Sequence, residues 1–338
     1  MTRTLIALLF GGLIFAALPA YAQFDTSEGA LSISPNPQYP LPNSTVQLTA
    51  ESPLLDLANS DIEWTVNGAA AGSGQSIKLT VGAPGSATNV SVSVSGQSGD
   101  DSAQLTLIPT SIDLLWEADS YTPPFYRGRA VPTSGSTIRL FAVPHFVASD
   151  GTVIASSGID FTWKVNGGVD EAQSGIGESS ALFPAAILYG TDVIEVDAQT
   201  PDGSLAGSAS ITIQTQAPQL VLYEDNPLFG LMYHQALGSS QNAPESETSF
   251  AAVPYFAEAA SPNDASLAYQ WSVNGSPVST DPSDPSEITI SASSSGEAQI
   301  QLSVSKPSDP FFSASGSWLV GFGESAQNAS SNPFNSSQ

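Results

Sequence analysis

Trp64-Thr65-Val66-Asn67-Gly68 decides the fold, because the pattern returns as Trp163-Lys164-Val165-Asn166-Gly167 and Trp271-Ser272-Val273-Asn274-Gly275. An apolar residue stands two positions before each Trp, so each copy alternates as a β-strand with one buried face does. Asn-Gly then favours the positive-φ turn that ends such a strand. The copies recur about every hundred residues, which indicates three repeats of one supersecondary unit.

Alternating strands follow each Trp, with Ser, Thr and acids at the polar positions. Period-two alternation predicts antiparallel sheets with one face in water. Helical periodicity is absent from the rest of the chain after residue 22, except for a weak pattern at residues 228–237. The alternating segments are Val90–Val94 and Ala103–Leu107, Ile194–Ala198 and Ala209–Ile213, and Ile300–Val304 with the less regular Trp318–Val320.

The chain resembles the bacterial immunoglobulin-like and PKD-type repeat modules of secreted and cell-surface proteins, whose central strand commonly reads aromatic-x-Trp-x-Val-Asn-Gly. The resemblance covers nearly all of residues 26–323 and rests on that one short motif and the strand rhythm. The Trp-Asp-Phe-Gly-Asp-Gly form of stricter PKD modules is missing. The resemblance implies spacers, adhesive units or assembly surfaces on envelope proteins.

We therefore predict an all-β protein of three tandem immunoglobulin-like antiparallel β-sandwich modules after a signal peptide. Trp64, Trp163 and Trp271 are predicted to fill the cores of these modules rather than to serve as carbohydrate-stacking platforms, since a Trp ring fills the space between two sheets. The predicted boundaries are 1–22 for the signal peptide, 23–109, 110–215 and 216–323 for modules 1, 2 and 3, and 324–338 for a disordered tail.

The N-terminus predicts export. Arg3 precedes an apolar run from Leu5 to Leu18, and Ala20-Tyr21-Ala22 forms an A-x-A cleavage site. The run is shorter than the roughly 20 residues a membrane-spanning helix needs, so we expect cleavage, with an uncleaved anchor as the alternative. We expect no membrane span in the mature chain and an extracellular, cell-surface or periplasm-like location.

Charge and cysteine content narrow the function classes. The net charge of −25 excludes nucleic acid as a plausible partner. Charged residues make up only 12% of the chain, so this acidity reflects scarce Lys and Arg on a neutral polar surface. The chain has no cysteine, so each predicted module depends on its own hydrophobic core.

Modules 2 and 3 carry extra apolar and aromatic sequence that module 1 lacks, starting at Trp116-Glu117 and Tyr223-Glu224. One interpretation is that these insertions cover a sheet edge or fill a junction between modules. The other is that they form a surface for an envelope or surface protein, since aromatics, Met and Arg are enriched at interfaces. The candidate partner-surface residues are Tyr121, Phe125, Tyr126, Arg127, Arg129, Phe229, Met232 and Tyr233.

Three of the few basic residues, Arg127, Arg129 and Arg139, form a local positive segment. They are expected either to pair within the chain, packing their stems, or to meet an acidic partner.

Catalysis finds little support in the sequence. His145 and His234 lie at non-equivalent positions, and no G-x-S-x-G motif or zinc spacing occurs. We predict no catalytic residues, no cofactor and no defined metal site. Calcium is an alternative, because carboxylates in loops bind it, but Asp-Gly is first a turn signal. The calcium candidates are Asp100-Asp101, Asp150-Gly151, Asp202-Gly203 and the pair Asp281 and Asp284.

The sequence thus predicts a non-catalytic secreted or envelope-associated binding or assembly protein, accessory to a surface structure. A passive structural spacer is the alternative, and a glycan-acting enzyme is a distant third. The sequence leaves the partner and the oligomeric state open.

Overall fold

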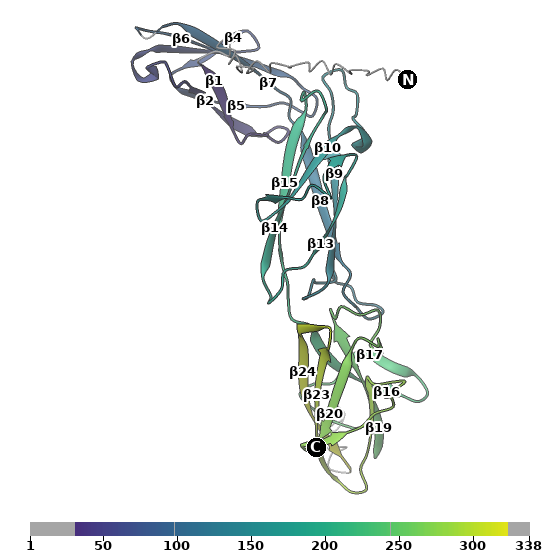
Figure 1. The fold of residues 1–338 in the computed structure, drawn as a ribbon. Coiled ribbons are helices and arrows are strands. Elements are labelled where there is room, and N and C mark those ends of the chain that lie inside the picture. Colours follow the sequence, from purple (N-terminus) through teal and green to yellow (C-terminus); the bar gives the residue numbers. More distant parts are fainter. Residues whose placement is uncertain (1–30, 98, 244, 324–338) are drawn as a thin grey trace, which may run out of the picture. The chain divides into compact units, whose positions relative to one another are not determined.

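The computed structural model describes residues 31–97, 99–243 and 245–323, so the predicted signal peptide and tail lie outside the described residues. Within these ranges the regular structure is β-strand, with two 3₁₀ helices, η1 (Leu57–Asn59) and η2 (Ser156–Gly158), and no α-helix. The strands form six sheets (Figure 1). No helix in the described ranges combines the length and apolarity needed to cross a membrane. The chain is an all-β protein, as predicted.

The first repeat lies in two sheets, with strand orders β1-β2-β5 and β4-β3-β6-β7. Ile62 and Trp64 alternate with exposed residues on β3, and Trp64 pairs with Val92 of β6. The strands are β1 (Ser32–Asn36), β2 (Thr45–Glu51), β3 (Asp61–Val66), β4 (Ala69–Ser73), β5 (Ser76–Thr80), β6 (Thr88–Ser95) and β7 (Asp101–Leu107).

The middle sandwich consists of the sheets β13-β9-β8 and β11-β10-β14-β15, with β12 also paired to β10. One buried core joins the two sheets, with Leu140 from the first and Trp163 and Ile194 from the second. Its strands are β8 (Ser111–Ala118), β9 (Thr137–His145), β10 (Asp160–Val165), β11 (Gly168–Val169), β12 (Gly175–Ile176), β13 (Ser180–Pro184), β14 (Thr191–Gln199) and β15 (Ala206–Gln214).

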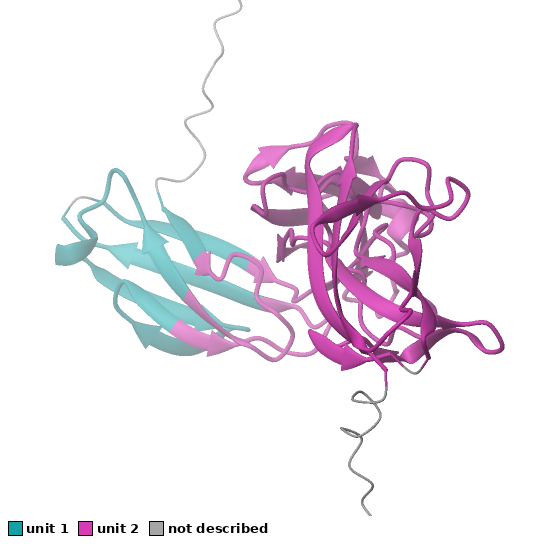
Figure 2. Cartoon of the chain, turned by 90° about the horizontal axis from the view of Figure 1, so that it is seen from below, with its two compact units in different colours: residues 1–34, 48–77, 89–105 teal, residues 35–47, 78–88, 106–338 magenta. Residues whose placement is uncertain are grey.

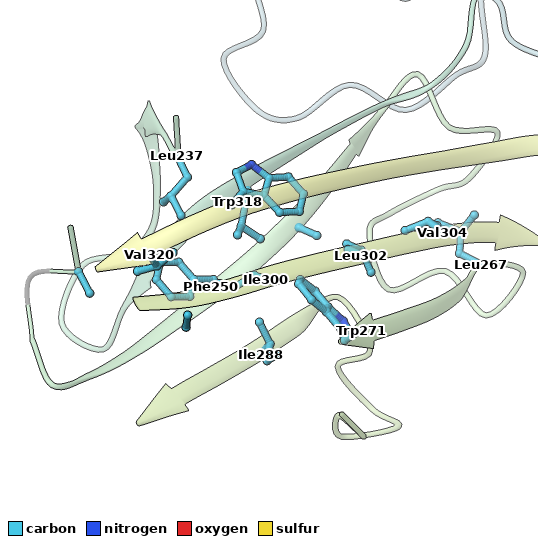
Figure 3. Packing of buried hydrophobic residues seen from close by; sticks show 14 of the residues in the cluster. Leu237, Phe250, Leu267, Trp271, Ile288, Ile300, Leu302, Val304, Trp318 and Val320 are labelled. Carbon is cyan, nitrogen blue, oxygen red and sulfur yellow. The ribbon is translucent and has the colours of Figure 1, made fainter. Parts of the chain in front are cut away.

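The C-terminal sandwich repeats this arrangement with the sheets β17-β16-β19-β22 and β18-β24-β23-β20-β21. Figure 3 shows its core, where Trp271 lies among Ile288, Ile300 and Leu302. β18 pairs with β24 in parallel. The strands are β16 (Gln219–Asn226), β17 (Gly230–Ala236), β18 (Ser240–Asn242), β19 (Glu247–Tyr255), β20 (Ala268–Val273), β21 (Ser276–Val278), β22 (Glu287–Ser291), β23 (Gly296–Lys306) and β24 (Asp309–Phe322).

The repeated tryptophan makes the same hydrogen bond in all three repeats. Trp64, Trp163 and Trp271 are at most 3% exposed. Each indole N–H donates to a backbone carbonyl, at 2.8 Å to Gly74, 2.8 Å to Glu178 and 3.0 Å to Pro285. A buried indole thus fills the core while its one polar group is satisfied.

The Asn of each Asn-Gly pair closes the turn in the same way each time. Asn67, Asn166 and Asn274 have φ values of 49°, 52° and 51°, and the following glycines lie near 80°. The Asn side-chain oxygen accepts a 2.9 Å bond from the backbone N–H of Asn89, Val193 or Gln299. The backbone N–H of the same Asn donates back to that residue's carbonyl. Asn therefore fits both the left-handed backbone and the acceptor that the turn requires.

Contacts divide the chain into two compact units (Figure 2). Unit 1 comprises residues 1–34, 48–77 and 89–105, and unit 2 comprises residues 35–47, 78–88 and 106–338. Both the middle and the C-terminal sandwich lie within unit 2. The predicted module boundaries stay predictions.

The prediction of a helix at residues 228–237 is wrong. This segment forms the turn after β16 and the strand β17, which pairs antiparallel with β16. Gly230 has a φ of 71° and lies where the chain reverses. Pairing with β16 gives the backbone N–H and C=O groups the hydrogen bonds that a helix would form within itself.

Candidate functional site

The outer face of the sheet β13-β9-β8 carries large apolar side chains in water. Leu115 on β8, Phe141 and Val143 on β9, and Leu182 on β13 are between 38% and 54% exposed. The strand register places Leu115 opposite Phe141, and Leu182 opposite Arg139, which lies two residues from Phe141 along β9. We call these four residues the open face. Clustered exposed apolar side chains mark interaction surfaces more often than scattered ones do.

Two exposed polar pairs border the open face. The Arg139 guanidinium lies 3.4 Å from the Glu117 carboxylate at one end. Near the other end, Nε2 of His145 lies 3.0 Å from Oδ2 of Asp113. Exposed pairs of this kind contribute about 0–1 kcal/mol to folding. They are therefore better suited to orient a partner than to stabilise the sheet.

The C-terminal sandwich has an equivalent face, identified by strand register. The pair Leu115 and Phe141 of the middle sandwich corresponds to the pair Tyr223 and Ala251 of the C-terminal sandwich. In the same way, the pair Asp113 and Val143 corresponds to the pair Val221 and Val253. Tyr223, Ala251 and Val253 are at most 5% exposed. We call these three residues the covered face. One position in the fold is therefore buried in one sandwich and open in the other.

Tyrosines from both predicted insertions cover this second face. Tyr233 of β17 packs edge-on against Tyr223, with ring centroids 5.4 Å apart. Tyr126, which precedes β9, packs edge-on against Tyr255 at 5.8 Å. The hydroxyls of Tyr223 and Tyr255 lie 2.7 Å apart, and the hydroxyl of Tyr121 hydrogen-bonds to Tyr233. We call these five residues the tyrosine cluster.

Backbone bonds tie the middle sandwich to the cluster. The Tyr121 N–H donates to the Ala257 carbonyl at 2.7 Å, and the Tyr121 carbonyl accepts from the Phe256 N–H at 2.7 Å. Further along, the Gln216 N–H donates to the Pro132 carbonyl at 2.9 Å. The segment before β9 thus pairs with the segment after β19, which makes part of the predicted insertion a structural contact.

The tyrosine cluster predicts a loss of stability at alkaline pH. Burial, and then the neighbouring Tyr233, raises the pKa of Tyr121 to about 12 from 10.0. Burial likewise raises the pKa of Tyr223 and Tyr233. The folded state therefore holds these protons more tightly than the unfolded state does, so their stabilisation is complete below pH 10 and falls as the pH rises towards 12. We expect urea unfolding midpoints to decrease over that interval.

The Tyr121→Phe variant is the control for this expectation. Phe cannot ionise, so the variant should show a shallower decrease between pH 10 and pH 12 than the wild type. Equal slopes for the two proteins would contradict the assignment of the effect to this hydroxyl.

The structure divides the predicted partner-surface residues into two groups. The first group lies in the tyrosine cluster or beside it, although Tyr126 remains 38% exposed: Tyr121, Tyr126, Met232 and Tyr233. Phe125, Arg127, Arg129 and Phe229 are exposed. Phe125 is 91% exposed with a φ of 68°, and the Arg129 guanidinium lies 4.5 Å from the centre of the Trp116 ring.

The turn between β16 and β17 presents two apolar side chains. Leu228 is 85% exposed and Phe229 is 76% exposed. The side-chain oxygen of Asn226 accepts hydrogen bonds from the N–H groups of both residues, at 3.0 and 3.3 Å. We call Leu228 and Phe229 the hairpin tip. Its backbone is held by the Asn226 side chain, which limits the entropy that docking would remove.

The sequence interpretation missed Leu115, Phe141, Val143 and Leu182. A signal was present, because Phe141-Ala142-Val143 is apolar at consecutive positions and so breaks the alternation of a strand with one wet face. Ala251-Ala252-Val253 interrupts the alternation in the same way, and its Ala251 and Val253 lie on the covered face. Sequence cannot distinguish a covered face from an open one, because the covering segments are distant along the chain.

An ionic contact fixes Lys306 near the end of β23. Its ammonium binds the Glu258 carboxylate and donates at 3.2 Å to the Glu258 carbonyl. Gly135 approaches so closely that a Cβ there would lie 2.6 Å from Oε2 of Glu258. The φ of Gly135 is 82°, so this position favours glycine for its backbone as well.

Three of the calcium candidates, Asp150, Asp202 and Asp281, accept hydrogen bonds within their own turns. Asp150 accepts from the Thr152 N–H, and Asp281 accepts from the Ser283 N–H. Hydrogen bonds from Thr200 and Ser204 lower the pKa of Asp202 to about 2. Within the described residues, no cluster of three or more His, Asp or Glu side chains is arranged to hold a metal ion. Asx turns of this kind need no ion.

A groove of about 910 Å³ lies on the outer side of the sheet that contains β20, β23 and β24. Its outward side chains are neutral, including Gln270, Gln301 and Ser315, and none of its lining residues is Asp or Glu. The carboxylate pair of a typical glycosidase is therefore not found in this groove.

Comparison with known proteins finds solved structures of low similarity. No family model and no curated sequence matches the chain. Among solved structures, the three N-terminal domains of the bacteriophage RB49 outer capsid protein Hoc are 13% identical, with coverage of 87% of this chain and 98% of that one and a TM-score of 0.24. A Bacteroides ovatus glucan-utilisation protein, SGBP-B in complex with a mixed-linkage heptasaccharide, is 12% identical, with 84% and 65% coverage and a TM-score of 0.24.

Fibronectin(III)-like modules of Clostridium thermocellum CbhA are 14% identical, with 55% and 94% coverage and a TM-score of 0.25. The fold follows from the chain's own sheets, which pack face to face around repeated tryptophans. They define an all-β protein with an immunoglobulin-like repeat fold.

Proposed function

We propose that this chain is a non-catalytic, exported binding and assembly protein of the bacterial immunoglobulin-like and PKD-type kind that its repeat motif resembles. Its docking surface is the open face. The N-terminal export pattern supports a place outside the cytoplasm, at an envelope or cell surface. The alternative is a passive spacer. Its one support is the tyrosine cluster, which joins two sandwiches and leaves no surface for a partner.

One observation carries this proposal. The equivalent positions of the two sandwiches are at most 5% exposed on the covered face and 38–54% exposed on the open face. Exposed apolar area of this kind costs about 25 cal/mol per Å² relative to burial. A partner that covers the open face therefore gains apolar burial of the kind that the tyrosine cluster provides on the C-terminal sandwich, less the cost of association.

Affinity capture tests the docking surface. Immobilised wild-type protein should retain an envelope or surface protein that the double variant Leu115→Ser, Phe141→Ser does not retain. Val169→Ser is the matched control, because Val169 is also 54% exposed but lies on β11 in the opposite sheet. Equal capture by the wild type and the double variant, each with an unchanged urea unfolding curve, would favour the spacer.

A further inference from the structure

The three Asn-Gly turns share one backbone geometry but differ in one side-chain contact. Asn67, Asn166 and Asn274 are all exposed, and their φ values lie between 49° and 52°. A Cβ atom on the glycine that follows each of them would meet nothing within 4 Å. Within the described residues, none of these three glycines donates a hydrogen bond from its backbone N–H. The backbone is therefore equally open at the three turns, and the Asn side chains set the difference between them.

Of these three turns, the middle one ties down the amino group of its Asn side chain. Nδ2 of Asn166 donates at 2.9 Å to Oδ1 of Asp192, which is 8% exposed. In the described part of the chain, the Nδ2 atoms of Asn67 and Asn274 make no hydrogen bond, and these two side chains are engaged through Oδ1. Hydrogen bonds to a carboxylate are stronger than those between neutral groups. The Asn166 side chain is therefore held more firmly than the other two.

The sequence of the neighbouring strand accounts for this difference. Strand register places Thr88 in the first repeat and Ala298 in the C-terminal sandwich at the position that Asp192 occupies in the middle sandwich. Neither residue provides a carboxylate acceptor. One position on the strand after the turn thus decides whether the amino group of the turn Asn is held.

We propose that Asn67 and Asn274 are sites of spontaneous deamidation in the folded chain, and that the contact with Asp192 protects Asn166 from this modification. In the first step, the backbone nitrogen of the following glycine attacks Cγ of the Asn side chain. The new N–Cγ bond replaces the bond from Cγ to Nδ2, and ammonia leaves with the proton of the glycine N–H. Water then opens the succinimide ring at either carbonyl, which gives Asp or isoaspartate. Glycine favours the attack because it has no side chain to screen its nitrogen.

Ring closure requires the Asn side chain to give up its contacts in the turn. At Asn67 and Asn274, the hydrogen bond from the neighbouring strand to Oδ1 breaks. At Asn166, the hydrogen bond to Asp192 breaks as well. Breaking one further hydrogen bond to a charged group corresponds to a rate that is lower by roughly tenfold. The protected turn belongs to the sandwich that carries the open face, so that sandwich keeps its hairpin while the other two turns age.

Peptide mass spectrometry of the folded full chain, incubated in mildly alkaline buffer, measures the three rates in one sample. We expect Asn67 and Asn274 to show the mass change of amide-to-acid conversion about tenfold faster than Asn166. In urea-unfolded protein the contact with Asp192 is lost, so the three rates should converge. Equal rates at the three turns of the folded chain would overturn the inference. So would a difference that persists in urea, because it would then belong to the local sequence.

Two substitutions remove or transfer the protecting contact. Asp192→Thr copies the first repeat and should raise the rate at Asn166 to that of Asn67. Ala298→Asp copies the middle sandwich and should slow Asn274 by about tenfold, whereas the control Ala298→Thr should leave Asn274 fast. Urea unfolding curves verify that each variant is folded, and the wild-type comparison stands without them. A folded Ala298→Asp variant with the wild-type rate at Asn274, or a folded Asp192→Thr variant that still protects Asn166, would contradict the role of the carboxylate.

Discussion

Replacing Trp163 with Ala will unfold the middle sandwich at markedly lower urea concentration. The side chain is 0% exposed, packs edge-on against Phe183 at 6.2 Å between centroids and donates its indole N–H to Glu178. Large-to-small core substitutions of this kind cost about 3–5 kcal/mol, because the cavity collapses only partly. Domains are typically stable by about 5–15 kcal/mol, so this is a large share of the total.

Equilibrium urea unfolding followed by circular dichroism measures this effect. Val169→Ala is the control, since that side chain is 54% exposed and its truncation should change stability by less than about 0.5 kcal/mol. A Trp163→Ala variant with the control's unfolding midpoint would show that the repeated tryptophan does not hold the core.

Lys306→Met should produce the second-largest loss, roughly 2–4 kcal/mol. The Lys306 side chain is only 12% exposed, and its ammonium is bound by the Glu258 carboxylate. Oδ2 of Asp309, the residue opposite Lys306 in the register, is buried without a hydrogen-bond partner. Removing the cation leaves Glu258 uncompensated in a largely buried place, which costs more than the net value of the pair itself.

The matched control is Lys78→Met, because Lys78 is exposed and its loss should change stability by less than about 0.5 kcal/mol. The double variant Lys306→Met, Glu258→Gln should recover part of the stability, since the uncompensated carboxylate is then gone. No difference in thermal or urea stability between the two single Lys variants would contradict the ionic account.

The short Trp-x-Val-Asn-Gly pattern carries much of the fold because each position has a separate physical role. Trp fills the core, Val continues the strand, and Asn-Gly takes the left-handed backbone. The three Asn side chains each accept from the neighbouring strand of the sheet. These are local interactions, or contacts with the neighbouring strand, so a single sequence predicts them well.

The candidate site was only partly predictable. The aromatic insertions were recognised, but Tyr121, Tyr126 and Tyr233 proved to be contacts that cover the C-terminal sandwich. The open face was missed because Phe141 and Val143 resemble core residues in sequence. Whether such a strand is covered depends on segments that are far away in the chain. The tip at Leu228 and Phe229 was read as a weak helix because its apolar spacing fits both structures.

Site-directed cross-linking tests the central claim most directly, because the chain contains no cysteine of its own. Leu115→Cys in the open face and Val169→Cys on β11 each carry a thiol-linked photo-cross-linker, and each protein is mixed with solubilised envelope protein and illuminated. The account predicts a cross-linked product from Leu115→Cys and none from Val169→Cys, although both side chains are 54% exposed. Equal cross-linking at the two positions would contradict docking on the open face.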